Sequence, residues 1–230
     1  MKLSIIIPVY NEAAHICELL RYLQNNLYDA ENCEILVIDG GSTDGTALKV
    51  TSFSNDIQLL HSVKGRGAQM NFGANTAKGE TLYFLHADSF PPKYFDKYIN
   101  DQVKKGNLAG CFKMKFDSNH WWLFLASWFT QFNLKFFRGG DQSLFVDKKL
   151  FKKLRGFPED HPIFEDFELI RLLYKTDKFT VISHWITSSS RRYKENGVAK
   201  LQYHYWILYI KKWFGASTDD LVSYYKKNIN

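Results

Sequence analysis

Short apolar runs alternate with amphipathic segments along the first half of the chain. The runs are rich in Ile, Leu and Val, whereas the segments between them repeat apolar residues at the spacing of a helix. This pattern predicts strands at 3–9, 34–38, 57–61 and 81–85 and helices at 12–26, 43–53 and 68–77. Strands that alternate with helices in this way form a parallel sheet covered by helices on both faces.

The later elements are less regular. The pattern predicts strands at 108–116, 143–146 and 180–182 and helices after Pro91-Pro92, from Trp121 onward and at 165–175, followed by two tyrosine- and lysine-rich helices. We therefore expect one α/β domain over residues 1–190, with a Rossmann-like, mostly parallel sheet and helices on both faces. Residues 191–230 are expected to form a basic, aromatic, helical C-terminal extension.

Polar or glycine-rich residues follow four of the predicted strands. They are Tyr10-Asn11-Glu12, Asp39-Gly40-Gly41-Ser42, Lys64-Gly65-Arg66-Gly67 and His86-Ala87-Asp88. Ligands bind to open α/β sheets in the crevice outside the carboxyl ends of the strands, where these segments should meet. The sequence therefore predicts one ligand site at this edge of the sheet.

Two of these segments suit a nucleotide diphosphate. Asp39 could accept from the N–H of a base, and the backbone amides that follow it could meet phosphate or ribose oxygens. A tight turn in which Ser42 or Thr43 caps the next helix explains the same residues. Asp88 could hold a divalent cation between two phosphates or could equally cap a helix.

Two other groups also allow a functional and a structural interpretation. Gly65-Arg66-Gly67 could bring a guanidinium to a diphosphate or could be a surface turn, and it matches neither the dinucleotide nor the P-loop fingerprint. Glu165-Asp166 lies between two phenylalanines, an environment that can raise the pKa of one carboxyl and suit it to act as a general base. An acidic helix N-terminus explains that pair as well.

In combination, these segments resemble glycosyltransferase family 2, whose members have the GT-A fold. The resemblance rests on Ser4-Ile5-Ile6-Ile7-Pro8-Val9-Tyr10-Asn11-Glu12, Asp39 to Thr46, His86-Ala87-Asp88 and Glu165-Asp166, and it covers about residues 1–185. It points to a bacterial subgroup with His-Ala-Asp in place of the family's Asp-x-Asp motif. It implies an inverting enzyme that moves a sugar from a nucleotide-diphosphate sugar, a UDP-sugar being favoured, to an acceptor hydroxyl.

The resemblance also implies roles for individual residues. The nucleotide-sugar site would be formed by Pro8, Tyr10, Glu12, Asp39, Gly41, Ser42, Arg66 and His86. Asp88 would bind Mg2+ or Mn2+ through the donor phosphates, because it matches the last acid of Asp-x-Asp. Asp166 would be the catalytic base, with Glu165 as its neighbour, and would take the proton of the attacking hydroxyl.

Departures from the family pattern place metal binding mainly on Asp88. Gly40 stands where the family often has a second acid, and His86 would touch the metal, a phosphate or neither. His184, just after the last predicted strand, would complete the metal shell or be structural. The Asp141-Gln142 pair would bind hydroxyls on the acceptor side, or would belong to a loop that enters a strand.

Charge is concentrated at the C-terminus. The 230-residue chain has a net charge of +6, and residues 191–230 alone hold eight basic and three acidic residues, a balance of +5. This asymmetry argues against a general nucleic-acid binder. The apolar stretch 201–214 indicates a helix that is packed, dimeric or bound at a membrane surface, and we expect a peripheral membrane contact or a homodimer through 191–230.

The hydropathy and the cysteine content of the chain are those of a cytoplasmic protein. No apolar stretch reaches the roughly 20 residues that a membrane-spanning helix needs. The three cysteines are widely spaced and lack a Cys-x-x-Cys pattern, so the sequence predicts neither a disulfide framework nor a cysteine zinc site. We expect a cytoplasmic protein, in peripheral contact with the inner face of the membrane.

Two other functions fit parts of the sequence. A nucleotidyltransferase also uses an α/β sheet, a nucleotide and an aspartate-held metal, but it would need a glycine- and arginine-rich loop directly after the first strand. A nucleotide-sugar-binding or membrane-associated scaffold without turnover would explain Gly40 and His86. The acids Asp39, Asp88 and Asp166 favour an enzyme. The donor sugar stays open, as does the acceptor, which could be a glycan, a lipid-linked molecule or a small molecule.

Overall fold

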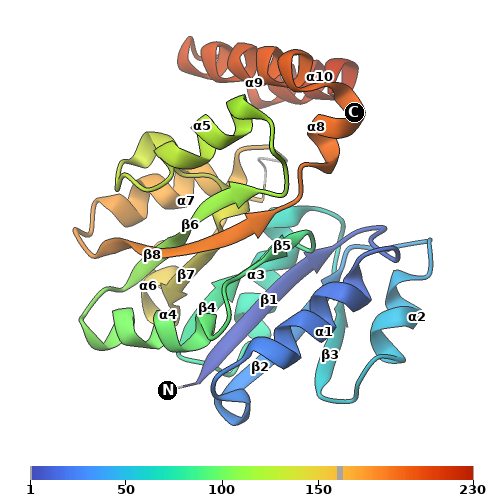
Figure 1. Ribbon diagram of the computed structural model, residues 1–230, viewed down its shortest axis with the longest axis vertical. Helices are drawn as coiled ribbons and strands as arrows, with labels where there is room; N and C mark the ends of the chain where they lie inside the picture. Colours follow the sequence, from blue (N-terminus) through green and yellow to red (C-terminus); the bar gives the residue numbers. More distant parts are fainter. Residues whose placement is uncertain (1, 160–162, 230) are drawn as a thin grey trace.

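The computed structural model of the chain describes residues 2–159 and 163–229, in which one sheet is surrounded by helices (Figure 1). The strands are β1 (Leu3–Val9), β2 (Cys33–Asp39), β3 (Ile57–His61), β4 (Thr81–Phe84), β5 (Ser89–Phe90), β6 (Ala109–Phe116), β7 (Leu144–Asp147) and β8 (Phe179–Ser188). The α-helices are α1 (Ile16–Asn26), α2 (Thr46–Thr51), α3 (Arg66–Thr76), α4 (Phe95–Lys104), α5 (Trp121–Phe129), α6 (Lys148–Lys153), α7 (Glu165–Tyr174), α8 (Arg191–Asn196), α9 (Val198–Trp213) and α10 (Thr218–Asn228).

The sheet has the strand order β3-β2-β1-β4-β7-β6-β8-β5. β1 pairs in parallel with β2 and β4, β2 with β3, and β6 with β8. β7 runs antiparallel between β4 and β6, and the short β5 runs antiparallel to β8 at the edge. The predicted α/β fold with a mostly parallel sheet is therefore confirmed. The alternation of strands and helices did not predict that β7 is inserted in the opposite direction.

Helices pack on both faces of this sheet. Ile5 and Ile7 belong to an apolar core that includes side chains of α1, α2 and α4, whereas Ile6 belongs to a second core with side chains of α3, α6 and α7. Successive side chains of a strand point to opposite faces, and all three isoleucines are fully buried. The continuous apolar run of β1 is thus explained by a strand covered on both sides.

Two helices begin later than their sequence pattern predicts. α1 begins at Ile16 and α2 at Thr46, because the loops before them are held by hydrogen bonds between the side chains of one and the backbone of the other. The alternative in which Ser42 or Thr43 caps the second helix is wrong, since Gly45 occupies the N-cap position and the N–H of Thr46, the first residue of α2, donates to Asp44 Oδ1 at 3.0 Å.

β8 is longer than predicted and contains a bulge. It pairs along the whole of β6, but the register shifts between Ile182, opposite Phe112, and Trp185, opposite Lys113. Ser183-His184 is therefore an insertion that bends the strand locally. The predicted strand end at 182 is wrong, because the polar residues that suggested it form the bulge.

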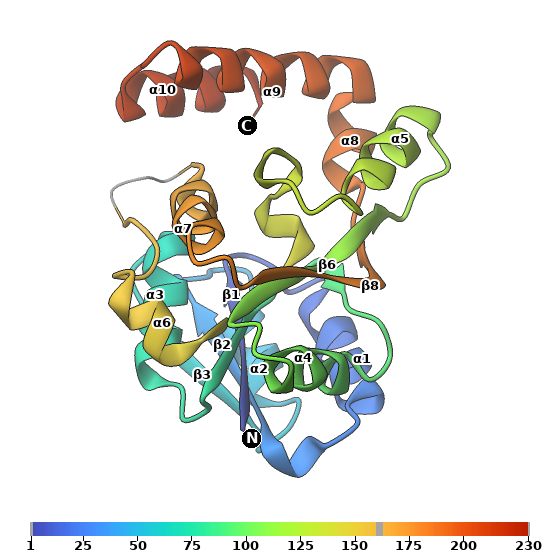
Figure 2. The ribbon, with the colours of Figure 1, turned by 90° about the vertical axis from the view of Figure 1, so that its left-hand side faces the viewer.

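Three helices, rather than the expected two, follow β8. The short α8 comes first, and α9 and α10 pack together through Leu201, Leu208 and Leu221. Figures 1 and 2 show these helices beyond the carboxyl ends of the parallel strands, close to α5 and α7. Among the described helices, none is both long enough and apolar enough to cross a bilayer.

Candidate active site at the carboxyl ends of the strands

Side-chain hydrogen bonds join the loops that follow β1 and β2. The backbone N–H of Asn11 donates to Ser42 Oγ and that of Glu12 donates to Thr46 Oγ1, each at 2.9 Å. In return, the N–H of Thr43 donates to Asn11 Oδ1 at 2.9 Å. The Ser-Thr-Asp-Gly-Thr segment therefore fixes the loop after β1 in place.

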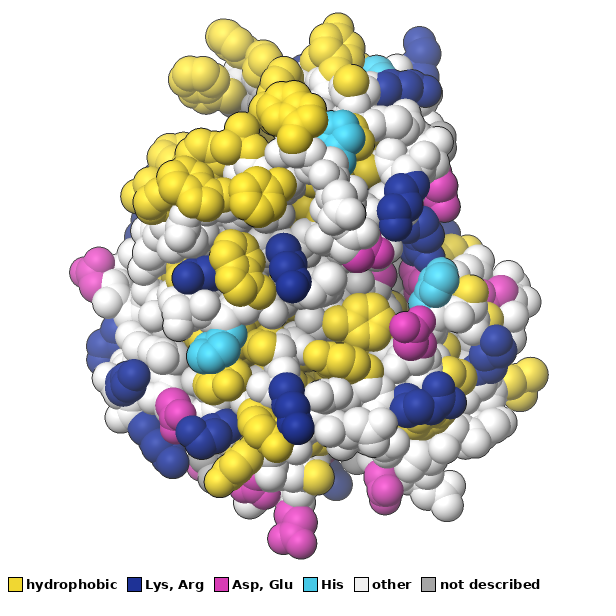
Figure 3. Space-filling model, viewed as in Figure 1, with side chains coloured by type: hydrophobic (Ala, Val, Ile, Leu, Met, Phe, Trp, Pro, Cys, Tyr) yellow, Lys and Arg dark blue, Asp and Glu magenta, His cyan; other side chains and the backbone are white. Residues whose placement is uncertain are grey.

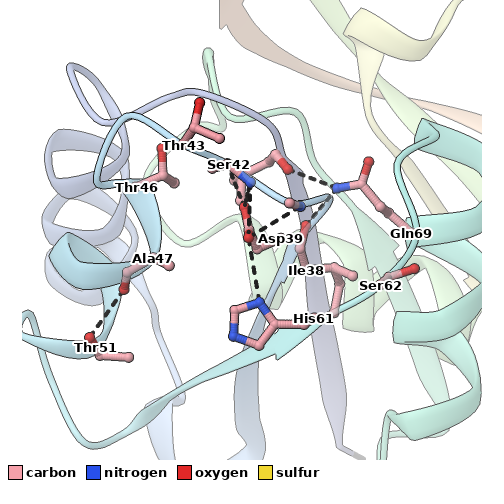
Figure 4. Close-up of polar contacts among 12 residues, drawn as sticks. Ile38, Asp39, Ser42, Thr43, Thr46, Ala47, Thr51, His61, Ser62 and Gln69 are labelled. Carbon is pink, nitrogen blue, oxygen red and sulfur yellow. Dashed lines mark hydrogen bonds and ion pairs between the residues drawn. The ribbon is translucent and has the colours of Figure 1, made fainter.

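Asp39 lies at the end of β2 and is only 2% exposed. Its carboxylate accepts hydrogen bonds from the backbone N–H of Gly41 at 3.3 Å and from the hydroxyl of Ser42 at 2.5 Å (Figure 4). The Nδ1 atom of His61 lies 3.4 Å from the same carboxylate. These groups hold a buried acid at the strand end, in an orientation fixed before any ligand binds.

Gln69 of α3 joins the ends of β1 and β2. Its Nε2 donates to the carbonyl oxygen of Val9 at 2.8 Å and to that of Ile38 at 2.7 Å (Figure 4). A Cβ atom at Gly40 would lie 3.0 Å from this side chain. An acid at position 40, which the family often has, would therefore push the Gln69 amide out of its place.

Tyr10 provides an aromatic ring at the end of β1. The side chain is 40% exposed, and the ammonium of Lys64, from the loop after β3, lies 3.7 Å from the ring centroid. This distance is typical of a cation–π contact. Pro8 lies two positions earlier and is partly buried. The loops after β1 and β3 thus form an aromatic and basic surface.

Arg191 of α8 returns to the loop after β1. Its Nη2 lies 3.3 Å from Oε1 of Glu12, 179 positions away in the sequence, and Glu12 Oε2 is buried without a hydrogen-bond partner among the described residues. Burial would lower the pKa of the Arg191 guanidinium, but the hydrogen bond and charge of Glu12 and the charge of Asp88 raise it. Arg191 is therefore paired with Glu12 at the loop after β1, and the charge of Asp88 acts on the same guanidinium.

A small pocket lies farther along the same edge of the sheet. Its lining includes the polar residues His86, Glu165 and Asp166 and the apolar residues Met70, Phe84, Leu144, Phe157 and Ile170. At its rim, His86 Nδ1 lies 3.1 Å from Asp141 Oδ1, and Arg66 Nη1 lies 3.2 Å from Glu165 Oε1. Two carboxylates are therefore paired with cationic or titratable groups, whereas Asp166 has no hydrogen-bond or ion-pair partner within residues 2–159 and 163–229.

The backbone of Gly140 closes one side of this pocket. A Cβ atom at this position would lie 2.8 Å from His86 Cε1 and 3.2 Å from Asp166 Oδ2. By contrast, a Cβ at Gly139 would meet nothing within 4 Å. Only the second glycine is therefore required for the close approach of this loop to Asp166.

The two acids beside the pocket have opposite pKa shifts. Burial, followed by the charge of Glu165, raises the pKa of Asp166 above that of an ordinary carboxyl. Burial would also raise the pKa of Asp141, but the hydrogen bond and the charge of His86 outweigh it and hold the pKa below its usual value. Asp166 is the acid that binds a proton more readily, as a general base requires.

Some predicted site residues lie elsewhere or point elsewhere. His184 lies in the β8 bulge with its ring stacked on Tyr98 of α4, at 3.7 Å between ring centroids, so the structure does not bring it into the pocket. The amide of Gln142 is turned inward, is 4% exposed and accepts from Arg138 at 2.6 Å. Of the Asp141-Gln142 pair, only Asp141 is open to solvent.

Protein side chains alone do not form a metal centre here. Among the described residues, no group of three or more His, Cys, Asp or Glu side chains could hold a metal ion. Mg2+ is usually bound by one or two carboxylates together with substrate phosphates. The single carboxylate of Asp88, near the Arg191 guanidinium, fits a cation that is held largely by a bound diphosphate.

Sequence reasoning missed three nearby groups. His61 lies opposite Asp39 in the register of β2 and β3. It is a polar residue at the carboxyl end of a predicted strand, so the search for polar residues at strand ends could have found it. Tyr209 and Lys212 come from α9: the centroid of the Tyr209 ring lies 5.1 Å from that of Phe164, and the Lys212 ammonium lies 4.1 Å from the centroid of the Phe167 ring. No sequence signal predicts these α9 contacts, because they depend on helix packing.

Comparison with known proteins places this site in a family context. Residues 4–152 match the family model described as Glycosyl transferase family 2. The chain is 37% identical over 93 residues to the glycosyltransferase AglE of Haloferax volcanii, a match that covers 38% of this chain and 31% of that protein. It is 33% identical over 114 residues to the poly(ribitol-phosphate) beta-N-acetylglucosaminyltransferase TarS of Staphylococcus aureus, covering 47% of this chain and 18% of that protein. The matched segments thus span less than a third of either relative.

Solved structures share the fold. The structure of S. aureus TarS 1–349 in complex with UDP superposes with a TM-score of 0.67 at 22% identity, covering 82% of this chain and 60% of that chain. The mannosyltransferase PcManGT of Pyrobaculum calidifontis, in complex with GDP-Man and Mn2+, gives a TM-score of 0.63 at 22% identity, covering 90% of this chain and 60% of that chain. The GT-A fold that the motifs implied is therefore confirmed.

Proposed function

The chain belongs to glycosyl transferase family 2, and on this premise we propose that it transfers a sugar from a nucleotide-diphosphate donor to an acceptor hydroxyl, with inversion at the anomeric carbon. The observation that carries the proposal is that the carboxylate of Asp166, which lines the pocket without a hydrogen-bond or ion-pair partner among the described residues, and the loops after β1 and β2 share one edge of the sheet. A base and a donor site must be neighbours for one enzyme to join the two substrates.

The donor side suits a nucleoside followed by a diphosphate. Asp39 is the proposed acceptor for the base, and Tyr10, Pro8 and Glu12 would line the nucleoside. Gly41 and Ser42 act on this site through Asp39, because their N–H groups donate to its carboxylate and hold it in place. A UDP-sugar is the favoured donor. The TarS structures contain UDP or UDP-GlcNAc and the PcManGT structure contains GDP-Man, so both bases belong in the test.

Asp88 is the proposed ligand of Mg2+ or Mn2+, with His86-Ala87-Asp88 in place of Asp-x-Asp. When bound with the donor, the cation supplies positive charge to the departing diphosphate. Arg191, on which the charge of Asp88 acts, and Arg66, at the rim of the pocket, add positive charge at this edge of the sheet. His184 has no role in this arrangement, because its ring is stacked on Tyr98.

Asp166 is the proposed base. It accepts the proton of the acceptor hydroxyl while the hydroxyl oxygen bonds to the anomeric carbon and the bond to the diphosphate oxygen breaks, leaving its electron pair on the diphosphate. Glu165 positions Arg66 and sustains the raised pKa of Asp166. Asp141, held by His86, lies at the open rim of the pocket, where an acceptor hydroxyl can be bound.

Calorimetric titration with UDP-sugars and GDP-mannose, with Mn2+ and with chelator, tests this assignment. We expect Asp88→Asn to weaken metal-dependent donor binding by at least about tenfold, since it removes a charged ligand. Asp166→Asn should retain donor binding and lower transfer by roughly 10²–10⁴-fold, as expected for a lost general base.

Two results would contradict the assignment. Unchanged turnover in both variants would remove Asp88 and Asp166 from the mechanism. Donor binding by the unsubstituted protein without transfer or hydrolysis would instead support a nucleotide-sugar-binding scaffold that has lost turnover.

For the acceptor, the proposal names only a chemical class and no individual molecule. A lipid-linked or glycan acceptor, reached from the cytoplasmic face of the membrane, is consistent with the basic and aromatic C-terminal helices. Trp206, Ile210 and Trp213 of α9 are all more than half exposed, which is why contact with a membrane or with a second copy through 191–230 stays in the proposal.

A further inference from the structure

An exposed aromatic surface covers α5, the turn after it and the outer side of α9. We call this surface, formed by residues 121–137 and 203–214, the aromatic face. Trp121, Phe124 and Phe136 are 68%, 72% and 78% exposed, and Trp213 and Phe214 are 86% and 84% exposed. Figure 3 shows hydrophobic side chains gathered over α5 and over the helices above it. Apolar surface on this scale marks an interaction site rather than ordinary exposed side chains.

The two halves of the aromatic face are in direct contact. The rings of Trp122 and Trp206 meet edge to face, with centroids 5.8 Å apart. The indole N–H of Trp122 also donates to Gln202 Oε1 at 3.2 Å. These contacts join α5 to α9, so that segments about eighty positions apart form one surface.

The charge of these segments is entirely positive. Residues 121–137 and 203–214 contain three lysines and no Asp or Glu. Lys135 and Lys211 are exposed, and the Lys135 ammonium lies 5.2 Å from the centroid of the Phe136 ring. Exposed Trp and Phe with lysines beside them and no acid among them are typical of surfaces that bind at the headgroup level of anionic membranes.

The aromatic face ends at the pocket. Residues 121–137 continue directly through Arg138 into Gly139-Gly140, which line the pocket, and the rings of Phe129 and Phe137 stack at 5.2 Å. From α9, the Tyr209 ring lies 5.1 Å from that of Phe164, the residue before Glu165-Asp166. A flat surface such as a membrane, if bound to the aromatic face, would therefore lie next to the pocket.

We propose that the aromatic face docks the protein on the surface of an anionic lipid bilayer, with α5 and the C-terminal end of α9 among the lipid headgroups. The surface is larger than the C-terminal extension, because α5 supplies half of it. This inference rests on the proposed function: if the protein transfers a sugar while docked in this way, the acceptor hydroxyl belongs to a molecule embedded in the bilayer.

A second copy of the chain is a poorer occupant. A twofold dimer through this face would set the basic segments of one copy near those of the other, with no acid in either segment to pair with them. Like charges brought together at an interface oppose association. An anionic bilayer meets the same lysines with opposite charge.

Vesicle sedimentation tests the docking surface without any acceptor. The full chain is mixed with vesicles of phosphatidylcholine containing about one third phosphatidylglycerol, and separately with pure phosphatidylcholine. We expect binding that is at least about tenfold stronger to the anionic vesicles and weakens with added salt. Trp121→Ser with Phe124→Ser, and separately Trp213→Ser with Phe214→Ser, should each lower the partition coefficient by at least about tenfold.

The control variants carry equally exposed apolar residues elsewhere. Leu48 and Val63 are both 73% exposed and lie outside the aromatic face, so Leu48→Ser with Val63→Ser should leave vesicle binding unchanged. Lys135→Gln with Lys211→Gln should weaken binding to anionic vesicles by about fivefold for each lysine and leave binding to neutral vesicles unchanged. UDP binding is measured in parallel for every variant, so that failure of the donor site is separated from failure of membrane docking.

Several outcomes would overturn the proposal. One is the absence of vesicle binding by a chain that still binds UDP. Another is an equal loss of vesicle binding in the Leu48 and Val63 control. A third is a protein that binds no vesicles and has twice the mass of one chain in light scattering, where the serine substitutions in α5 and α9 restore the mass of one chain. A second copy of the chain, rather than a bilayer, would then cover the aromatic face.

Discussion

The surroundings of Asp166, rather than its residue type, suit it to accept a proton. Burial and the charge of Glu165 raise its pKa, and these effects exceed the lowering effect of Arg66. A base of raised pKa loses activity as the pH falls through a value above the ordinary carboxyl range, because only the deprotonated form accepts a proton. The acidic limb of the rate profile therefore reports on this one residue.

Glu165→Gln tests that dependence. The substitution removes a negative charge that raises the pKa of Asp166 and frees Arg66, whose charge lowers it, so both effects act in the same direction. We expect the acidic limb of kcat/KM to move to lower pH. Glu168→Gln is the matched control, because Glu168 pairs with Arg171 on the same helix and should leave the limb in place. A limb that moves to higher pH in Glu165→Gln would contradict the assignment.

A second prediction at this scale uses two adjacent glycines. Gly140→Ala places a methyl group 2.8 Å from His86 Cε1 and 3.2 Å from Asp166 Oδ2. Overpacking of this kind costs about 1–3 kcal/mol, and the collision displaces the groups around the proposed base. We expect kcat/KM to fall by at least about tenfold, with donor binding retained. Gly139→Ala meets no atom within 4 Å and should behave like the unsubstituted protein; equal effects of the two substitutions would argue against a role for this close contact.

At the scale of elements, the loop between α5 and β7 connects the aromatic face to the pocket. Arg138 organises it from within: its guanidinium is 7% exposed and donates to the carbonyl oxygens of Thr130 and Phe132 and to Gln142 Oε1. The loop therefore folds around one buried cation. Its contacts turn Gln142 inward and leave Asp141 at the rim.

Removal of that guanidinium should loosen the loop. Arg138→Met keeps much of the side-chain volume but leaves several buried acceptors without a donor, at a cost of about 3 kcal/mol. For a chain of this size, the melting temperature falls by roughly 2–4 °C per kcal/mol, which thermal unfolding followed by circular dichroism can measure. Lys135→Met, at an exposed position of the same loop, is the control. A melting temperature of Arg138→Met equal to that of the control would show that the loop does not depend on these hydrogen bonds.

At the scale of the whole molecule, the donor side is closed by a contact between the two ends of the chain. Glu12 follows the first strand and Arg191 begins the helices after the last strand, yet their side chains lie 3.3 Å apart. Asp88, from the middle strands, also acts on Arg191. The position of this cation therefore depends on the packing of α8 against the loop after the first strand, and the proposed donor diphosphate would lie beside it.

Arg191→Gln should weaken binding of UDP but not of uridine. A charge-assisted hydrogen bond contributes about 1.5–3 kcal/mol, which corresponds to a loss of roughly tenfold or more in the affinity for the diphosphate. Lys194→Gln, on the same helix but paired with Asp117, is the control and should leave UDP binding unchanged. An equal loss for uridine and UDP in Arg191→Gln would show that the arginine supports the loop rather than the diphosphate.

The sequence by itself located seven of the eight strands in the described residues, all but the short β5, and the edge of the sheet where the charged residues meet, but neither the direction of β7 nor the full length of β8. Apolar runs such as 3–9 are local signals, since a strand buried on both faces must be apolar at every position. The motif residues after these strands were found for the same reason: parallel strands end at a common edge. Helix starts were less accurate, because the loops after β1 and β2 hydrogen-bond to each other.

Only the tertiary structure decided which of those residues face one another. His184 was a reasonable candidate by its place in the sequence, but a bulge in β8 and the stack on Tyr98 put it outside the pocket. The Arg191–Glu12 pair, the contact of Tyr209 with Phe164 and the joining of α5 to α9 all involve residues far apart in the chain. Local patterns encode secondary structure and strand ends, whereas such contacts depend on how complete helices pack on the finished sheet.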